Sequence, residues 1–392
     1  MAQNLITFEN ALKENYLPVW NNQLGTEPSP LLGKIKKVPL VSDKIVAAAQ
    51  IGLSGGFGFG AEGEATPAAG NVNFSRFETR AKDMYVNVAI SAKAVKLTGS
   101  GGAMASALDT EVKAAYETAK WNVGRALFGN GTGKLATISA LSSAGNTLTV
   151  DSTARLKEGL IIDIYATSGT SPQTGGAGRR ITAVDRKNKK ITISGDASTF
   201  SAGFITVQNS YNREITGLGA IFDDSITSIY GVSKASNPYL YPVVTDAGKD
   251  IDDGIITDAL RQASRDKNSN VDMILAGDGA YDSYISYLRV NNIRVEDMSK
   301  TITGGFKSIK FIFGNREVDL VNESFVPSDE MWGVDTKSIE LHSQDWSFAE
   351  LQGGGIFNLM ENSSIYRALL VNYGDLICTN PGGCVRIHNC CA

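Results

Sequence analysis

A glycine-rich stretch near the start of the chain limits its fold more than any other feature. The longest uncharged run, residues 45–61, is 17 residues long and contains five glycines. That length is at the short limit for a membrane span, so a membrane-inserting peptide is one interpretation. Glycine costs about 1 kcal/mol per residue in a helix, and glycines continue to residue 70. The run therefore favours a flexible loop.

A β pattern follows the glycines. Over residues 84–94, apolar and mostly polar side chains alternate, and a period of two predicts a long strand with one buried face. We expect residues 44–96 to form an extended two-stranded ribbon with a projecting glycine tip. Because an isolated ribbon of two strands is marginally stable, we expect it to lie across another subunit.

The first 45 residues are predicted to be an arm. Leu5, Phe8 and Leu12 begin an apolar stripe at spacings of three and four, which predicts a short amphipathic helix ending near Pro18. No partner for this stripe lies nearby in sequence, so we expect it to dock on the chain's own body or on a neighbour. Residues 1–10 lack the charged start and apolar core of an export signal.

The rest of the chain divides into three kinds of pattern. Residues 106–128 carry the clearest helical stripe, about 35 Å long at 1.5 Å per residue. Residues 137–207 contain short β runs between loops of glycine, serine and threonine, which predicts a small all-β insertion. From Tyr211 onward, helical stripes alternate with buried strands, and a helix is expected to start near Asp246. The overall fold class is therefore predicted to be α+β.

Composition argues against several classes of function. Hydrophobic residues make up 42% of the 392-residue chain, enough for a real core. Lys and Arg (37) nearly balance Asp and Glu (41), so the chain lacks the excess of positive charge expected of a dedicated nucleic-acid binder. The two histidines, His342 and His388, leave little material for a histidine-rich metal site or a proton-shuttling enzyme.

Three glycine motifs resemble catalytic or cofactor signatures. Residues 58–63 match G-x-G-x-x-G, but more glycine precedes them and Pro67 follows, where a dinucleotide site needs a strand and a helix. Residues 52–56 match the G-x-S-x-G of hydrolases around Ser54, yet glycines occupy the place of the required helix. Residues 129–134 resemble a phosphate loop without its first glycine and its Ser or Thr. We predict no enzyme activity and no cofactor, and no metal site at these motifs.

Paired carboxylates and a cluster of cysteines are two further candidate sites. Asp252 and Asp253 fall in the first turn of a predicted helix, where the helix dipole favours negative charge. All four cysteines lie in the last fifteen residues, without the paired spacing of a zinc site. Free thiols, disulfides within or between subunits, and a metal site with His388 all stay open. The cysteines are Cys378, Cys384, Cys390 and Cys391.

The order of these patterns resembles the major capsid protein of tailed bacteriophages, of the Hong Kong ninety-seven type. The resemblance covers essentially the whole chain, including the place of the insertion after the long helix. Local stretches that carry it are residues 213–218 as the chain leaves the insertion, the strand-to-helix stretch 271–278, and the closing strand and turn of residues 366–387.

This resemblance implies a division of the chain. Residues 1–45 would be the N-terminal arm and 46–96 the extended β-hairpin loop. The peripheral domain with the spine helix would comprise 97–136 and 360–392. Residues 137–210 would be the β insertion domain, and 211–359 the axial domain.

The resemblance also implies function. The chain is expected to self-assemble as hexamers and pentamers of an icosahedral shell that encloses double-stranded DNA, contacted weakly and without sequence specificity. Other expected partners are portal, scaffolding and decoration proteins, with no membrane. The location would be the virion, after assembly in the bacterial cytoplasm. The alternatives are an encapsulin-like compartment shell, then a membrane-active protein or a hydrolase.

Candidate contacts between subunits follow from the arm and the loop. We expect them at Phe8, Leu12, Phe57, Phe59, Arg76, Glu78 and Arg80, although a merely solvated strand face explains the charged three equally well. Some capsid proteins of this type crosslink through a lysine in the extended loop. No lysine occurs between Lys44 and Lys82, so we predict no crosslink of that kind. Because the arm begins at Met1, we expect scaffolding to come from a separate protein or to be absent.

Overall fold

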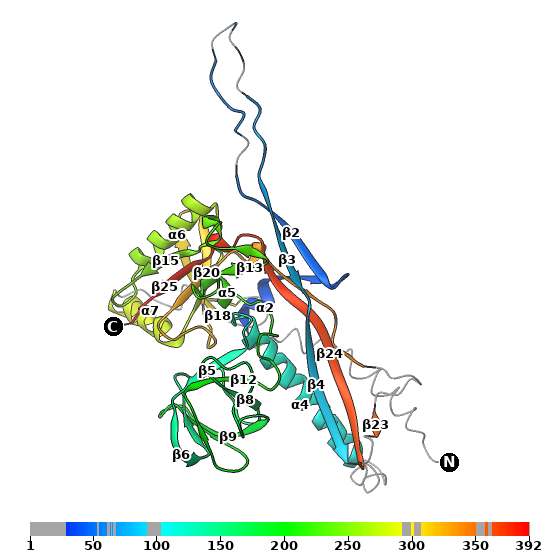
Figure 1. Ribbon diagram of the computed structural model, residues 1–392. Coiled ribbons are helices and arrows are strands. Elements are labelled where there is room, and N and C mark those ends of the chain that lie inside the picture. The colour runs from blue at the N-terminus through cyan, green and yellow to red at the C-terminus, as the bar shows by residue number, and fades with distance from the viewer. Residues whose placement is uncertain are drawn as a thin grey trace.

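The computed structural model describes residues 29–52, 55–60, 63, 65, 68–91, 103–291, 299–301, 307–349, 357–359 and 363–391. Within these ranges, the side chains of residues 103–111, 142, 299–301 and 307 are not described. Strands outnumber helices, and the chain forms two large sheets, a separate β insertion and a projecting hairpin (Figure 1).

The first large sheet, which we call the long sheet, is built on the 14-residue strand β24 (Ile365–Cys378). Strand β4 (Lys82–Ser91) runs antiparallel to it over ten residue pairs, from Gly374↔Lys82 to Ile365↔Ser91. Strand β21 (Ile339–Ser343) pairs with the last five residues of β24, and β1 (Lys36–Pro39) lies parallel to β21. Two short strands, β22 (Ser347–Phe348) and β23 (Asn358–Leu359), also pair with β24.

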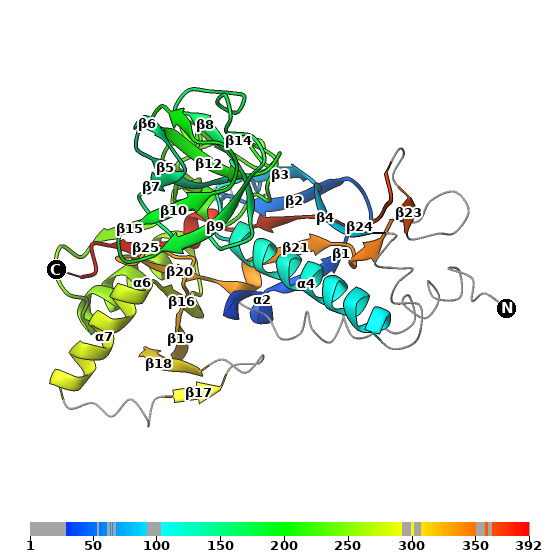
Figure 2. The same ribbon diagram turned by 90° about the horizontal axis from the view of Figure 1, so that it is seen from below.

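The spine helix α4 (Ala103–Ala126) covers one face of the long sheet (Figure 2). Val112 and Tyr116 of the helix pack with Leu370 of β24, and Ala115 packs with Val88 of β4. These contacts use the apolar stripe of the helix, so a pair of long strands gains the buried face that it needs to be stable.

The second large sheet has seven strands, in the order β15-β25-β20-β16-β19-β18-β17. Helices α6 (Asp253–Lys267) and α7 (Asp278–Val290) pack on it through buried residues such as Leu260 and Tyr284. Its strands are β15 (Val243–Asp246), β25 (Val385–His388), β20 (Met331–Val334), β16 (Met273–Ala276), β19 (Arg316–Asn322), β18 (Lys307–Phe313) and β17 (Ser299–Thr301).

The β insertion has a hydrophobic core of its own, built from aliphatic side chains such as Ile162, Ile164 and Ile205. Its sheet has the order β5-β12-β8-β9-β10-β7, beside a separate pair of strands, β6 and β11. The strands are β5 (Lys134–Ile138), β6 (Leu141–Gly145), β7 (Thr147–Thr149), β8 (Ile161–Ala166), β9 (Arg179–Asp185), β10 (Lys190–Ile193), β11 (Ser198–Phe200) and β12 (Gly203–Val207).

Short elements join these parts. Helix α2 (Pro30–Lys34) precedes β1, and the hairpin consists of β2 (Lys44–Gln50), β3 (Phe74–Arg80) and the described residues between them. The remaining elements are α5 (Gly219–Phe222), β13 (Ser228–Ile229), β14 (Val232–Ser233) and the single 3₁₀ turns Pro238–Leu240, Thr336–Ser338 and Pro381–Gly383.

Several expectations from the sequence need correction. The strand over residues 82–91 is not part of the two-stranded ribbon, because β4 pairs with β24 and the ribbon is β2 with β3. The spine helix begins at Ala103, and α6 begins at Asp253 rather than near Asp246. Side-chain alternation reveals that one face of a strand is buried, but it does not identify the neighbouring strand.

Strand pairing also crosses the expected domain boundaries. Strand β25 was expected with the spine helix, yet it lies in the seven-stranded sheet between β15 and β20. Strands β21 and β22 were expected in the axial part, yet they pair with β24. The arm helix expected before Pro18 lies outside the described residues.

Gly217 is closely packed at the point where the chain leaves the insertion. A Cβ atom there would lie 2.5 Å from the carbonyl oxygens of Ala126 and Leu127 and 2.6 Å from that of Gly129. We expect Gly217→Ala to lower the free energy of unfolding by about 1–3 kcal/mol, the usual cost of overpacking. Chemical denaturation of the unassembled chain measures this, with Gly52→Ala as the control because nothing lies within 4 Å of that position. Equal midpoints for the two variants would contradict the prediction.

Candidate subunit interface

The hairpin exposes large apolar side chains far from the core. Figure 1 shows it extending well beyond both large sheets. Phe57 and Phe59 are 81% and 96% exposed, and their rings form an edge-to-face pair with centroids 5.2 Å apart. Val46, Ile51, Val72 and Phe74 are also exposed. An apolar surface of this kind marks a site of contact with another molecule.

The two legs of the hairpin touch beyond the paired strands. The Ile51 N–H donates to the carbonyl of Asn73 at 2.8 Å, which continues the pairing past Gln50↔Phe74. A Cβ atom on Gly70 would lie 2.2 Å from the backbone nitrogen of Gly55, so no other residue fits there without moving the backbone. The glycines therefore permit a narrow, extended hairpin.

The root of the hairpin is buried. Ile45 and Phe77 belong to the main hydrophobic core, and the Phe77 ring packs near the Tyr230 ring at 5.9 Å. The Glu78 N–H donates to the carbonyl of Tyr230 at 2.9 Å. Tyr230 and Gly231 form the turn between β13 and β14, and both hold a positive φ, of 51° and 77°.

One buried carboxylate joins the hairpin root to two other parts of the chain. Asp375 of β24 accepts a hydrogen bond from the Thr79 hydroxyl of β3 through Oδ2. Its Oδ1 accepts from the N–H groups of Thr216 at 2.7 Å and Leu376 at 2.9 Å. Burial raises the pKa of Asp375 above its usual range, although these donors oppose the rise.

The expected charged contacts divide into two groups. Glu78 forms an ion pair with Lys44 across the hairpin and lies 3.6 Å from Arg76. The hydrogen bond from Lys44 is the main cause that lowers the pKa of Glu78. Arg80 is exposed and has no ion pair with any residue that the structure describes. Among the described residues, Arg80 is therefore the charged candidate that forms no ion pair, although its charge also lowers the pKa of Glu78.

The arm is attached to the chain's own body where its description begins. Leu31 and Leu32 of α2 are buried in the main core. The Ser29 hydroxyl donates to Oε2 of Glu323 at 2.7 Å, and Lys34 pairs with Asp319. Burial raises the pKa of Glu323 to about 7, against the lowering effect of the Ser29 hydroxyl.

The other arm candidates cannot be placed in the same way. Phe8 and Leu12 lie outside the described residues, so their contacts stay predictions. The described part of the arm, from Ser29 onward, docks on the body. Where the apolar stripe before Pro18 docks stays a prediction.

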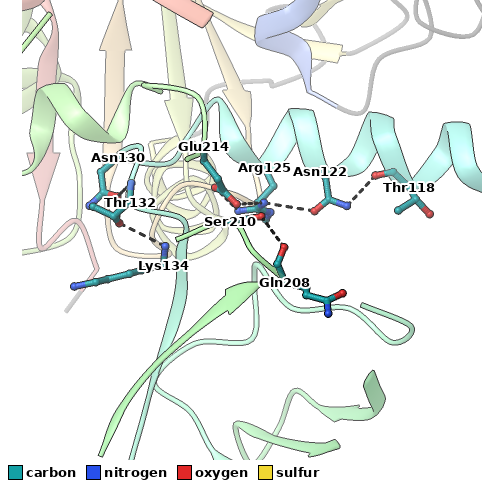
Figure 3. A network of polar contacts seen from close by, with 9 residues as sticks. All are labelled: Thr118, Asn122, Arg125, Asn130, Thr132, Lys134, Gln208, Ser210 and Glu214. Atoms are coloured by element: carbon teal, nitrogen blue, oxygen red, sulfur yellow. Dashed lines mark hydrogen bonds and ion pairs between the residues drawn. The ribbon is translucent and has the colours of Figure 1, made fainter. Parts of the chain in front are cut away.

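A buried ion pair fixes the segment that leaves the insertion to the spine helix (Figure 3). Arg125 near the end of α4 donates to both carboxylate oxygens of Glu214, at 2.7 and 3.0 Å. Asn122 on the preceding turn lies 3.5 Å from the same guanidinium group. Both partners are nearly inaccessible to solvent, so removing one would leave an uncompensated buried charge.

The motifs that resemble active sites have structural roles where they are described. Asp252 caps α6 by accepting from the Ile255 N–H at 2.9 Å, as the helix-dipole interpretation predicted. Asn130 and Thr132 of the phosphate-loop-like stretch form a hydrogen-bonded turn. Ser54 lies outside the described residues.

Two searches of the described residues bear on other kinds of site. No group of three or more His, Cys, Asp or Glu side chains in this part of the chain is arranged to hold a metal ion. No helix among the described residues is both long enough and apolar enough to cross a membrane.

The four cysteines are free thiols in different surroundings. Cys378, Cys384 and Cys390 are buried, and burial raises the pKa of Cys390 to about 12. Cys391 is exposed. A disulfide between subunits, which stays a prediction, would therefore use Cys391.

Comparison with known proteins rests on structure, since no protein-family profile and no curated protein matches the sequence. A chain of the cyanophage A-1(L) capsid asymmetric unit superposes with a TM-score of 0.54 over 92% of both chains, at 11% identity. The chain has the Hong Kong ninety-seven-type capsid fold.

Two further structures are similar at lower scores. The holo-SrpI encapsulin complex from Synechococcus elongatus PCC 7942 has a TM-score of 0.47 at 9% identity, over 93% of this chain and 88% of that chain. Mycobacterium phage Bobi has a TM-score of 0.45 at 12% identity, over 92% of this chain and 90% of that chain. The α+β capsid fold expected from the sequence is confirmed by the A-1(L) capsid chain.

Glu323 provides a pH-dependent test of how the arm is attached. Its folded-state pKa of about 7 lies above the ordinary value of 4.5, so the folded state holds the proton more tightly. The free energy of unfolding should therefore fall as pH rises from 4.5 to 7, by up to about 3 kcal/mol at 1.36 kcal/mol per pKa unit.

The substitution Glu323→Gln should remove this loss, because the amide stays neutral and still accepts from Ser29. Urea denaturation between pH 4.5 and 8 measures the effect. Glu117→Gln, at an exposed position on α4, is the control and should keep the wild-type pH dependence. A Glu323→Gln chain that follows the wild-type curve would show that this carboxyl does not control the dependence.

Proposed function

We propose that the chain is the major capsid protein of a tailed bacteriophage, and that its copies assemble as hexamers and pentamers of an icosahedral shell. The single observation that carries the proposal is the hairpin, whose root is buried and whose far part exposes Phe57 and Phe59. Among the described residues, Phe57 and Phe59 pack on each other and stay largely exposed, away from the core of their own chain. A neighbouring copy would supply an apolar partner for them.

Shell assembly explains why the apolar contacts lie so far from the core. Each copy would reach onto a neighbour through its hairpin and would receive the hairpin of another copy. Many weak interfaces of this kind sum to a durable shell, because each copy is held at several points at once. In this proposal the chain has no catalytic role.

The partners and location follow from the same proposal. Double-stranded DNA would be enclosed and contacted weakly, which suits a chain with a formal net charge of −4. Portal, scaffolding and decoration proteins would complete the particle. Assembly would take place in the bacterial cytoplasm, and the mature location would be the virion.

An encapsulin-like compartment is the second candidate, since the SrpI encapsulin complex is among the similar structures. Such a shell would enclose a protein cargo rather than DNA. The β insertion favours the phage capsid, because some phage capsid proteins of this type carry an insertion at this position.

Assembly of the purified full chain tests the proposed function directly. We expect closed shells of uniform diameter in negative-stain electron microscopy. A monodisperse monomer or dimer under all assembling conditions would contradict the proposal. Particles isolated from cells that contain an enzyme and no DNA would favour the compartment instead.

The hairpin aromatics are expected to be needed for assembly but not for folding. The double variant Phe57→Ser/Phe59→Ser should remain folded, because exposed substitutions usually change stability by less than about 0.5 kcal/mol. Its yield of closed shells should fall at least tenfold in sedimentation and electron microscopy. Ile161→Ser, an exposed apolar position on the insertion, is the control. Normal shells from the double variant would show that these rings do not form the contact.

A further inference from the structure

Three segments that are distant in sequence meet at the carboxylate of Asp375. Thr79 belongs to the hairpin root, Thr216 lies just after the insertion, and Asp375 itself is on β24. The Asp375 side chain is fully buried. A buried carboxylate is costly unless it is well hydrogen-bonded, so its three donors are needed for its own stability.

The Thr79 hydroxyl is the only one of these donors that belongs to a side chain. The Thr216 and Leu376 donors are backbone N–H groups held by the surrounding chain. Gly217, next to Thr216, is packed against the end of the spine helix. Two backbone donors therefore hold the Asp375 carboxylate in place, and the Thr79 hydroxyl links the hairpin to it.

The far part of the hairpin lies a long distance from Thr79. Residue 68 lies eleven residues before Thr79 on the returning leg of the hairpin, on the order of 36 Å away at 3.3 Å per residue. A rotation of about 10° at the root would then move the far part by roughly 6 Å, more than the ~4 Å over which apolar side chains touch. A small change in the direction of the hairpin at Thr79 would therefore move Phe57 and Phe59 out of contact with the neighbouring copy.

Tyr230 provides one other hydrogen-bonded link from the root to β24, because its hydroxyl accepts from the Cys378 N–H at 3.1 Å. The remaining contacts at the root restrain this rotation less directly. The pairing of β2 with β3 fixes the two legs to each other, not to the long sheet. Phe77 is anchored by packing in the core, which is not directional. The Glu78 N–H bonds the carbonyl of Tyr230, which lies in the turn between two-residue strands. Asp375 instead lies on β24 where that strand pairs with β21, one residue beyond the last pair with β4 at Gly374.

We propose that Asp375 is the positioning residue that sets the direction of the hairpin relative to the long sheet, through the hydroxyl of Thr79. Its importance for assembly rests on the proposed function, but the direction of the hairpin is a property of the single chain. The two can therefore be tested separately.

The decisive comparison is Thr79→Val against Thr79→Ser. Valine keeps the shape of threonine and removes the hydroxyl, whereas serine keeps the hydroxyl. Spin labels at Asn71 on the hairpin and Arg261 on α6, in a Cys391→Ser chain, report the hairpin direction as a distance distribution in the unassembled protein. Both labelled positions are exposed.

The wild-type and Thr79→Ser chains should give the same narrow distribution, and Thr79→Val should give one that is shifted or at least twice as wide. Ser75→Ala removes another hydroxyl from the same strand and should behave as wild type. Identical distributions for all four chains would overturn the proposal, and so would a change in Thr79→Ser as large as in Thr79→Val.

Shell formation provides the second readout. Thr79→Val should lower the yield of uniform shells at least tenfold, and Thr79→Ser should restore it. If Thr79→Val changes the distance distribution and still forms normal shells, the direction set by Asp375 does not matter for assembly, and that part of the proposal is wrong. If no chain forms shells while the distances change as expected, the proposed function fails and the positioning role stands.

Discussion

The pairing of β4 with β24 is the interaction on which the rest of the structure depends. Ten consecutive residue pairs join a strand from the first quarter of the chain to one near its end. The spine helix covers one face of this pair, and β4 follows directly from the root of the hairpin through Ala81. Without that pairing neither the helix nor the hairpin would have a fixed support, because two long strands alone are marginally stable.

Much of this arrangement could be predicted from periodicity. The alternation over residues 84–94 indicated a long strand, and the stripe over 106–128 indicated the spine helix. The glycines correctly indicated a non-helical extension. Partner choice could not be predicted, since β4 shows one buried face whether its neighbour is β3 or β24. For the same reason, the place of β25 in the seven-stranded sheet could not be predicted.

The candidate interface could be predicted only in part. Phe57 and Phe59 stand out among glycines, and the structure leaves both exposed. The roles of Thr79, Asp375 and Glu323 were missed, because each depends on contacts between residues about 300 apart in sequence. A single threonine or aspartate carries no local pattern. The one available signal was Asp375 itself, the only acidic residue in a mostly apolar strand.

The insertion enters and leaves the body at neighbouring points. Strands β5 and β12, its first and last, pair antiparallel from Gly203↔Ile138 to Thr206↔Lys134. Its core is also separate from the other two main cores. The insertion could therefore be gained, lost or exchanged during evolution without a change in the strand pairing of the rest of the chain. A foreign domain with closely spaced ends could likewise be inserted at the same junction for display.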